Sequence, residues 1–168
     1  IKAAVLYAPK MPLVVDEVEL QAPQRRDVLV RLAASGLCPT DMHAMTGDRP
    51  RPLPAVLGHE GAGVVEAVGE DVSLVKRGDH VICSWAPNCG HCFYCDLDLP
   101  VLCEALTKAS PNGVMFDGTP RHAKDGRPIY NFTMVSSHAE CCVVPEAGAI
   151  PIPKEMPLDR ACLIGCGV

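Results

Sequence analysis

Aromatic residues and long apolar segments are both scarce in this 168-residue sequence. Phe, Trp and Tyr together make up only 4% of the chain, so any aromatic pocket has to be built from very few side chains. The longest apolar runs have the length of a β-strand, well below the roughly 20 residues that a membrane-spanning helix needs. The sequence therefore excludes a membrane-spanning helix, and we expect no membrane partner.

The sequence also lacks a basic patch and an export signal. Its formal net charge is −5, with both signs scattered along the chain, so we expect no nucleic-acid partner. The first residues, Ile1 to Tyr7, have no cationic flank, long apolar core or small-residue cleavage site, which a signal peptide would require. We expect a cytoplasmic protein, trimmed at its start because no initiator Met is present.

Cysteine, by contrast, is abundant, with ten residues. Four of them are closely spaced, in the run Cys89-Gly-His-Cys92-Phe-Tyr-Cys95 and at Cys103. Cysteines at i, i+3 and i+6 do not easily pair with one another, but they can surround one ion, as in a four-thiolate structural zinc site. Because a disulfide framework belongs to exported proteins, we prefer metal binding in a reducing compartment.

The pattern along the chain predicts a mainly β fold with short α-helices. Sixteen prolines and fourteen glycines favour short strands and turns. We predict strands over residues 3–7, 13–20, 28–34, 58–69, 79–84 and 139–144, short helices over 40–45 and from 157, and a turn-rich segment over 110–131. Residues 1–168 are predicted to form one domain, a bent β-barrel with a cysteine lobe at about 86–104.

A second, dispersed group of potential ligands is more informative about function. His59 stands in the string Gly58-His59-Glu60, Cys38 follows a predicted strand, and Cys166 lies between two glycines. Two thiolates and one imidazole leave the fourth position of a tetrahedral zinc ion open, which is the catalytic form of the site.

These residues also carry a family resemblance. The string Gly58-His59-Glu60-x-x-Gly63-x5-Gly69-x-x-Val72, the intervals from Cys38 to His59 and on to Cys166, and the four-cysteine lobe occur in one order. In this the sequence resembles the N-terminal, GroES-like catalytic domain of the zinc-dependent medium-chain alcohol dehydrogenases, over essentially all its residues.

The resemblance implies two zinc ions and a role for each ligand. Cys38, His59 and Cys166 would bind the catalytic zinc. Glu60 would lie behind the metal, close enough to exchange with a ligand, and Asp41 would accept a hydrogen bond from the ring of His59. The structural zinc would be held by Cys89, Cys92, Cys95 and Cys103.

The resemblance also implies a proton path and a substrate pocket. Thr40 would bond the substrate oxygen, and His43 would pass the proton to solvent through the nicotinamide ribose. Trp85 and Phe132 match positions that wall the substrate pocket. Each has a plainer alternative, since Thr40 and His43 could be ordinary helix residues and the two aromatics ordinary core residues.

Four other cysteines and Pro39 are also interpreted from their positions in the sequence. We interpret Cys83, Cys141, Cys142 and Cys162 as packing residues, because both metal sites are already supplied. Pro39 stands where relatives often carry a basic residue near the coenzyme pyrophosphate, which predicts weaker coenzyme binding there.

No Gly-x-Gly-x-x-Gly follows a strand, so the NAD or NADP domain is expected to be absent from this chain, and residues 1–168 to be inactive alone. The expected parent enzyme is a homo-oligomer that oxidises small primary or secondary alcohols to aldehydes or ketones by hydride transfer to NAD(P). A thiol-adduct (formaldehyde) dehydrogenase of the same family is one alternative. A non-enzymatic, zinc-stabilised domain is the other.

Overall fold

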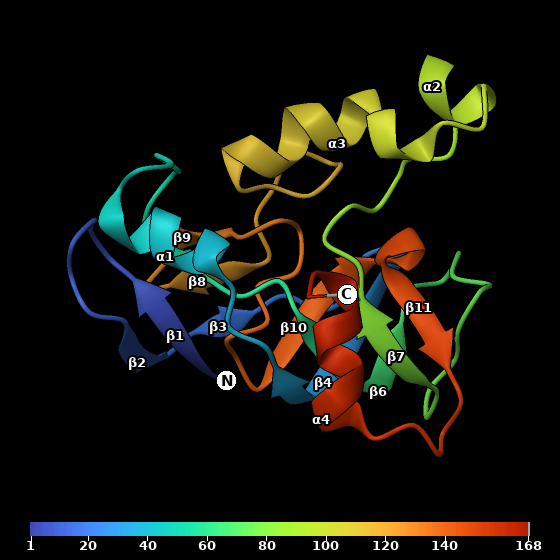
Figure 1. Ribbon diagram of the computed structural model, residues 1–168, viewed down its shortest axis with the longest axis horizontal. Coiled ribbons are helices and arrows are strands. Elements are labelled where there is room, and N and C mark those ends of the chain that lie inside the picture. The colour runs from blue at the N-terminus through green and yellow to red at the C-terminus, as the bar shows by residue number, and fades with distance from the viewer. Residues whose placement is uncertain (168) are drawn as a thin grey trace.

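The computed structural model describes residues 1–167 and is built on two sheets. The first sheet has the strand order β2-β1-β5-β9-β8-β3, and the second has the order β10-β4-β6-β7-β11 (Figure 1). The strands are β1 (Lys2–Leu6), β2 (Val14–Glu17), β3 (Glu19–Leu20), β4 (Asp27–Ser35), β5 (Ala55–Val56), β6 (Gly61–Val68), β7 (His80–Cys83), β8 (His122–Lys124), β9 (Arg127–Asn131), β10 (Cys141–Pro145) and β11 (Ala149–Ile152). The mainly β architecture with short helices expected from the sequence is confirmed.

The helices are short and lie outside the sheets. They are α1 (Pro39–Thr46), α2 (Phe93–Asp96), α3 (Glu104–Ala109) and α4 (Leu158–Ala161), with 3-10 turns η1 (Pro100–Leu102), η2 (Ser110–Asn112), η3 (Glu146–Gly148) and η4 (Cys162–Gly165). None of the helices within residues 1–167 is long and apolar enough to cross a membrane.

The central strand β4 organises the main core. It pairs antiparallel with β6 on one side and β10 on the other, and its inward residues Val28 and Val30 are completely buried. Strands β4 and β6 approach closely at Gly63, where a Cβ would lie 2.2 Å from the carbonyl oxygen of Arg31. Glycine at this position lets the two strands pair without a clash.

Two parts of the predicted pattern need correction. The strand expected over residues 13–20 is split into β2, which pairs with β1, and β3, which pairs with β8 instead. The segment 110–131 is more regular than expected, since β8 and β9 form a hairpin across a turn at Asp125 and Gly126. Both turn residues have positive φ, 50° and 72°, as this tight turn requires.

The cysteine lobe forms a separate projection above the sheets (Figure 1). It contains α2, η1 and α3, and it has a small core of its own that includes Cys103, Leu106 and Met115. Its helices have only four to six residues, too few to be stable alone in water. The lobe therefore needs a cross-link, and its four cysteines are placed to supply one.

Candidate metal centres

The first residues of α1 place Cys38 at the start of the helix. Cys38 is the N-cap, its thiol lies 3.5 Å from the N–H of Thr40, and the Asp41 carboxylate accepts the N–H of Cys38 at 3.1 Å. Pro39 occupies the first helical position, where no N–H is needed, and Gly47 ends the helix with φ of 84°. The helix predicted over residues 40–45 is confirmed.

Four side chains from distant parts of the chain meet beside this helix. One potential ligand atom from each of Cys38, His59, Glu60 and Cys166 lies within 4.8 Å of all the others. The sulfur atoms of Cys38 and Cys166 are 3.8 Å apart. Two thiolates bound to one tetrahedral zinc at about 2.3 Å have the same sulfur separation, about 3.8 Å. The donor atoms and their spacing therefore fit a zinc ion.

The pKa values of these two thiols are shifted in opposite directions. Burial, followed by the neighbouring Cys38 thiol, raises the pKa of the Cys166 thiol to about 11. At Cys38 burial acts in the same direction, but contacts with Thr40, Cys166 and His59 outweigh it and lower the pKa. Two adjacent thiols do not both ionise readily unless a cation neutralises them, which a bound metal ion does.

The carboxylate of Asp41 holds both Cys38 and His59 in place. Its Oδ1 accepts the N–H of Gly58 at 3.0 Å and lies 3.4 Å from Nδ1 of His59, while its Oδ2 takes the N–H of Cys38. Burial would raise the pKa of Asp41, but the His59 ring and the N–H of Cys38 hold it below its usual value. With Nδ1 facing Asp41, Nε2 is the nitrogen that faces the metal site.

Glu60 lies at the first centre itself. It is 4% exposed, and its carboxylate belongs to the four-atom group. Gly36 leaves room for it, because a Cβ there would lie 2.0 Å from Oε2 of Glu60. The site therefore offers four potential protein donors.

Thr40 and His43, the residues expected to carry the proton, both lie on α1, and His43 is the more exposed of the two. Thr40 is partly buried, with its hydroxyl 3.5 Å from the sulfur of Cys38. His43 is exposed one turn later, and its Nδ1 lies 3.6 Å from Oδ2 of Asp48. No local pattern singles out Asp48, which follows the helix end and comes near His43 only because the chain turns back at Gly47.

The two aromatic residues expected in the pocket differ in their surroundings. Phe132 is completely buried, and its ring centre lies 5.6 Å from that of His59. Trp85 is 44% exposed in the segment after β7. The guanidinium carbon of Arg51 lies 4.3 Å from the centre of the Phe132 ring, so Arg51 joins this group although the sequence did not indicate it.

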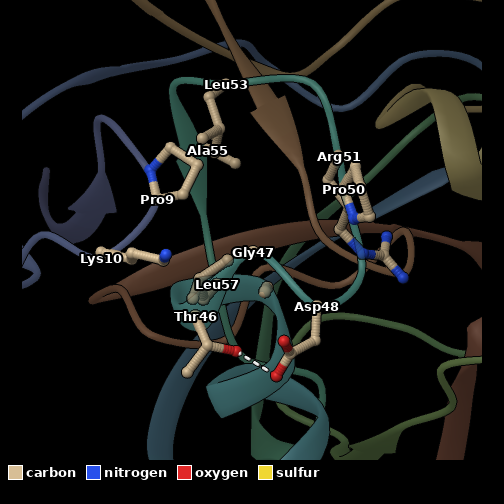
Figure 2. Close-up of a pocket in the computed structure, with 11 residues that line it drawn as sticks. Pro9, Lys10, Thr46, Gly47, Asp48, Pro50, Arg51, Leu53, Ala55 and Leu57 are labelled. Carbon is tan, nitrogen blue, oxygen red and sulfur yellow. Dashed lines mark hydrogen bonds between the residues drawn. The ribbon is translucent and has the colours of Figure 1, made fainter.

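A cavity of about 400 Å³ lies along the C-terminal half of α1 and the loop after it (Figure 2). Thr46 and Asp48 form one part of its lining, joined by a hydrogen bond of 2.7 Å, and Pro9 and Lys10 lie across from Arg51. None of the four donors at the first centre lines it.

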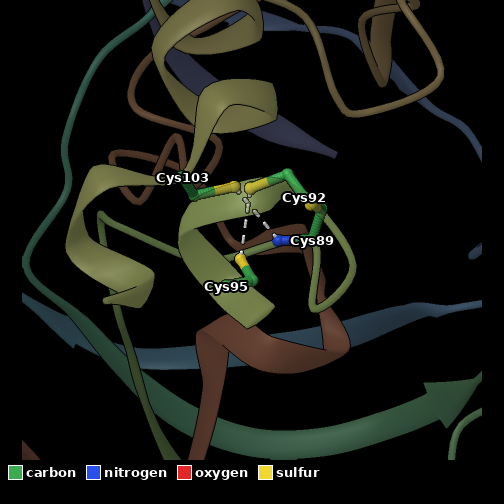
Figure 3. Close-up of side chains that lie close together, drawn as sticks. All are labelled: Cys89, Cys92, Cys95 and Cys103. Atoms are coloured by element: carbon green, nitrogen blue, oxygen red, sulfur yellow. Dashed lines mark hydrogen bonds between the residues drawn. The ribbon is translucent and has the colours of Figure 1, made fainter. Parts of the chain in front are cut away.

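The second centre consists of the four lobe cysteines, whose sulfur atoms all lie within 4.8 Å of one another (Figure 3). Cys92 and Cys103 are the N-caps of α2 and α3, so their sulfurs lie near free N–H groups. The N–H groups of Cys95 and Glu104 lower the pKa of Cys92 to about 6, which favours the thiolate. Four sulfurs without another donor match a closed structural zinc site.

A family model for the alcohol dehydrogenase GroES-like domain matches residues 24–154. The chain belongs to this family. It is 44% identical over 168 residues to S-(hydroxymethyl)glutathione dehydrogenase of Saccharomyces cerevisiae and 39% identical to alcohol dehydrogenase class-3 of Dictyostelium discoideum. In each case 99% of this chain is aligned, and it spans 44% of the relative's length.

Solved structures of other family members have the same fold. An alcohol dehydrogenase zinc-binding domain protein from Burkholderia ambifaria superimposes with a TM-score of 0.92 at 40% identity, over 99% of this chain and 45% of that one. Benzyl alcohol dehydrogenase from Acinetobacter calcoaceticus gives a TM-score of 0.90 at 31% identity, over 99% of this chain and 44% of that one. The arrangement of sheets and lobe is therefore that of a family catalytic domain.

Proposed function

We propose that this chain is the metal-binding catalytic domain of a zinc-dependent dehydrogenase that oxidises small primary or secondary alcohols with NAD or NADP. The single observation that carries the proposal is the presence of two different donor groups in one chain. One is a shell of four thiols, suited to a structural ion. The other mixes two thiols, an imidazole and a carboxylate, with a hydroxyl beside it at Thr40.

We assign Cys38, His59 and Cys166 as ligands of a catalytic zinc, with Glu60 as the exchangeable fourth donor. When bound there, zinc acts as a Lewis acid that lowers the pKa of an alcohol hydroxyl towards neutrality. A nicotinamide coenzyme would supply the acceptor for the hydride of the carbinol carbon.

The protein's own side chains position the alcohol and remove its proton. Thr40 accepts the hydroxyl proton and passes on its own, because a hydroxyl donates and accepts at the same time. His43, exposed beside Asp48, delivers the proton to solvent. Asp41 fixes the orientation of His59, and the buried ring of Phe132 forms an apolar wall that keeps water from one side of the site.

The test is a zinc count combined with an activity assay on the intact enzyme. Wild type should contain two zinc ions per chain and oxidise benzyl alcohol with NAD or NADP. Cys38→Ser should retain one zinc and lose oxidation, whereas the matched variant Cys141→Ser should keep both. A single zinc in wild type, bound by the lobe cysteines and without oxidation, would favour a non-enzymatic zinc-stabilised domain.

Oxidation of a thiol adduct is the second candidate. It is favoured by the 44% identity to the S-(hydroxymethyl)glutathione dehydrogenase of yeast. Comparing kcat/KM for S-(hydroxymethyl)glutathione and benzyl alcohol in the same preparation decides between the two. We further propose a cytoplasmic homo-oligomer, which mass photometry of the intact enzyme can test.

A further inference from the structure

Arg51 projects from one of the stiffest segments of the chain. It lies between Pro50 and Pro52, in the loop that joins α1 to β5. Proline fixes its own φ and confines the residue before it to extended conformations. The backbone at Arg51 is therefore held in place, and the side chain begins from a defined position.

The guanidinium of Arg51 extends over a ring that borders the first metal centre. Its carbon lies 4.3 Å from the centre of the Phe132 ring, whose centre is 5.6 Å from that of His59. These two contacts place the charge within about 10 Å of the His59 ring. That distance corresponds to the length of a small aryl alcohol with a substituent at its far end.

The charge of Arg51 has no carboxylate partner within residues 1–167. Arg25, Arg26 and Arg121 each form an ion pair in this part of the chain, whereas no acidic oxygen lies within 4.0 Å of Arg51. Among the described residues, its one hydrogen bond goes from Nη1 to the carbonyl oxygen of Ser110 at 3.5 Å. Because a partly buried guanidinium without a counter-charge is costly, this arrangement favours an anion supplied from outside the chain.

We propose that Arg51 binds the anionic group, a carboxylate, of an alcohol substrate whose hydroxyl lies at the first metal centre. The inference rests on the proposed function and names its substrate class. The planar guanidinium can bind a carboxylate with two parallel hydrogen bonds, and the contact with the Phe132 ring helps to hold the guanidinium in position. A coenzyme phosphate offers the same anionic chemistry, so the test has to separate the two sources.

The experiment compares 4-(hydroxymethyl)benzoate with its neutral analogue 4-(hydroxymethyl)benzamide in the intact enzyme. Wild type should prefer the benzoate in kcat/KM. Arg51→Met should reduce the ratio of the two kcat/KM values by about 10- to 100-fold, with the loss mainly in KM for the benzoate. Arg51→Lys should retain part of the preference, and Arg77→Met, which removes an exposed arginine, should leave the ratio unchanged.

The outcomes separate this inference from the proposed function. If both compounds are oxidised with equal kcat/KM in wild type, or if Arg51→Met lowers both equally, the carboxylate role is wrong while the dehydrogenase function stands. If Arg51→Met raises the dissociation constant of the coenzyme and leaves the substrate ratio unchanged, the anion is a coenzyme phosphate and the proposal is overturned. If the zinc-loaded enzyme oxidises neither compound, nor benzyl alcohol, the proposed function itself fails.

Discussion

Oδ1 of Asp41 lies 3.4 Å from Nδ1 of His59 and accepts the backbone N–H of Gly58 at 3.0 Å. Through Oδ2 the same carboxylate accepts the N–H of Cys38. One buried charge therefore fixes two of the proposed metal ligands, which come from different elements of the fold.

We predict that Asp41→Asn weakens zinc binding at the first centre by about 10- to 100-fold. The amide removes the negative charge, and its own N–H group would face the N–H groups that the carboxylate accepts in wild type. Chelator competition monitored by mass spectrometry measures this change. The lobe zinc should be unaffected. Asp159→Asn, which alters an exposed aspartate in the first turn of α4, is the control. Equal zinc affinity in wild type and Asp41→Asn would contradict the positioning role.

Replacing one lobe cysteine should unfold the lobe alone. We predict that Cys103→Ser loses one zinc per chain and becomes sensitive to proteolysis within about residues 86–115, because the short helices there lack other support. The control is Cys141→Ser, which changes a cysteine outside both donor groups. Intact protection of the lobe in Cys103→Ser, with two zinc ions retained, would show that these thiols are not ligands.

Gly58 is predicted to be irreplaceable for both backbone and steric reasons. Its φ is 90°, and a Cβ would lie 2.6 Å from the backbone nitrogen of His138. Gly58→Ala should therefore lower the free energy of unfolding by about 2 to 4 kcal/mol and weaken zinc at His59. Gly118 has a similar φ of 82° with open space around it, so Gly118→Ala should cost only about 1 kcal/mol. Urea denaturation measures the free energy of unfolding of both variants. Equal losses of stability would show that the steric clash at Gly58 contributes nothing.

His122 should make the protein less stable in acid. It is 1% exposed in β8, and burial, with a smaller effect from the N-terminal ammonium, lowers its pKa from 6.5 to about 4. Between these values the unfolded chain binds a proton that the folded one does not, so stability falls as the pH decreases from 6.5 to 4. The loss is on the order of 3 kcal/mol.

His122→Leu should flatten this acid dependence. Leucine suits the site because its cross-strand neighbours are Leu20 and Ile129. Urea denaturation at several pH values compares the two slopes, and loss of zinc in acid affects both proteins alike. Parallel curves for wild type and His122→Leu would contradict the prediction.

Local sequence signals were sufficient for several elements. The helix α1 was predictable because Pro39 suits its first turn and Gly47 its end, and both signals act within a few residues. The two-residue strand β5 was not, since two residues show no periodicity and its place is set by pairing with Val5 and Leu6 of β1. The β8–β9 hairpin was hidden because only its turn, at Asp125 and Gly126, carries a clear signal.

The sequence by itself determined the donor types, the compact spacing of the lobe cysteines and the glycines around His59, because these depend on neighbours along the chain. Only the tertiary structure decided which distant groups meet. Cys166 lies 128 positions from Cys38, yet their sulfurs are 3.8 Å apart. The guanidinium of Arg51 stacks on Phe132, a residue after β9. Such contacts follow from strand register and sheet curvature, which no local pattern encodes.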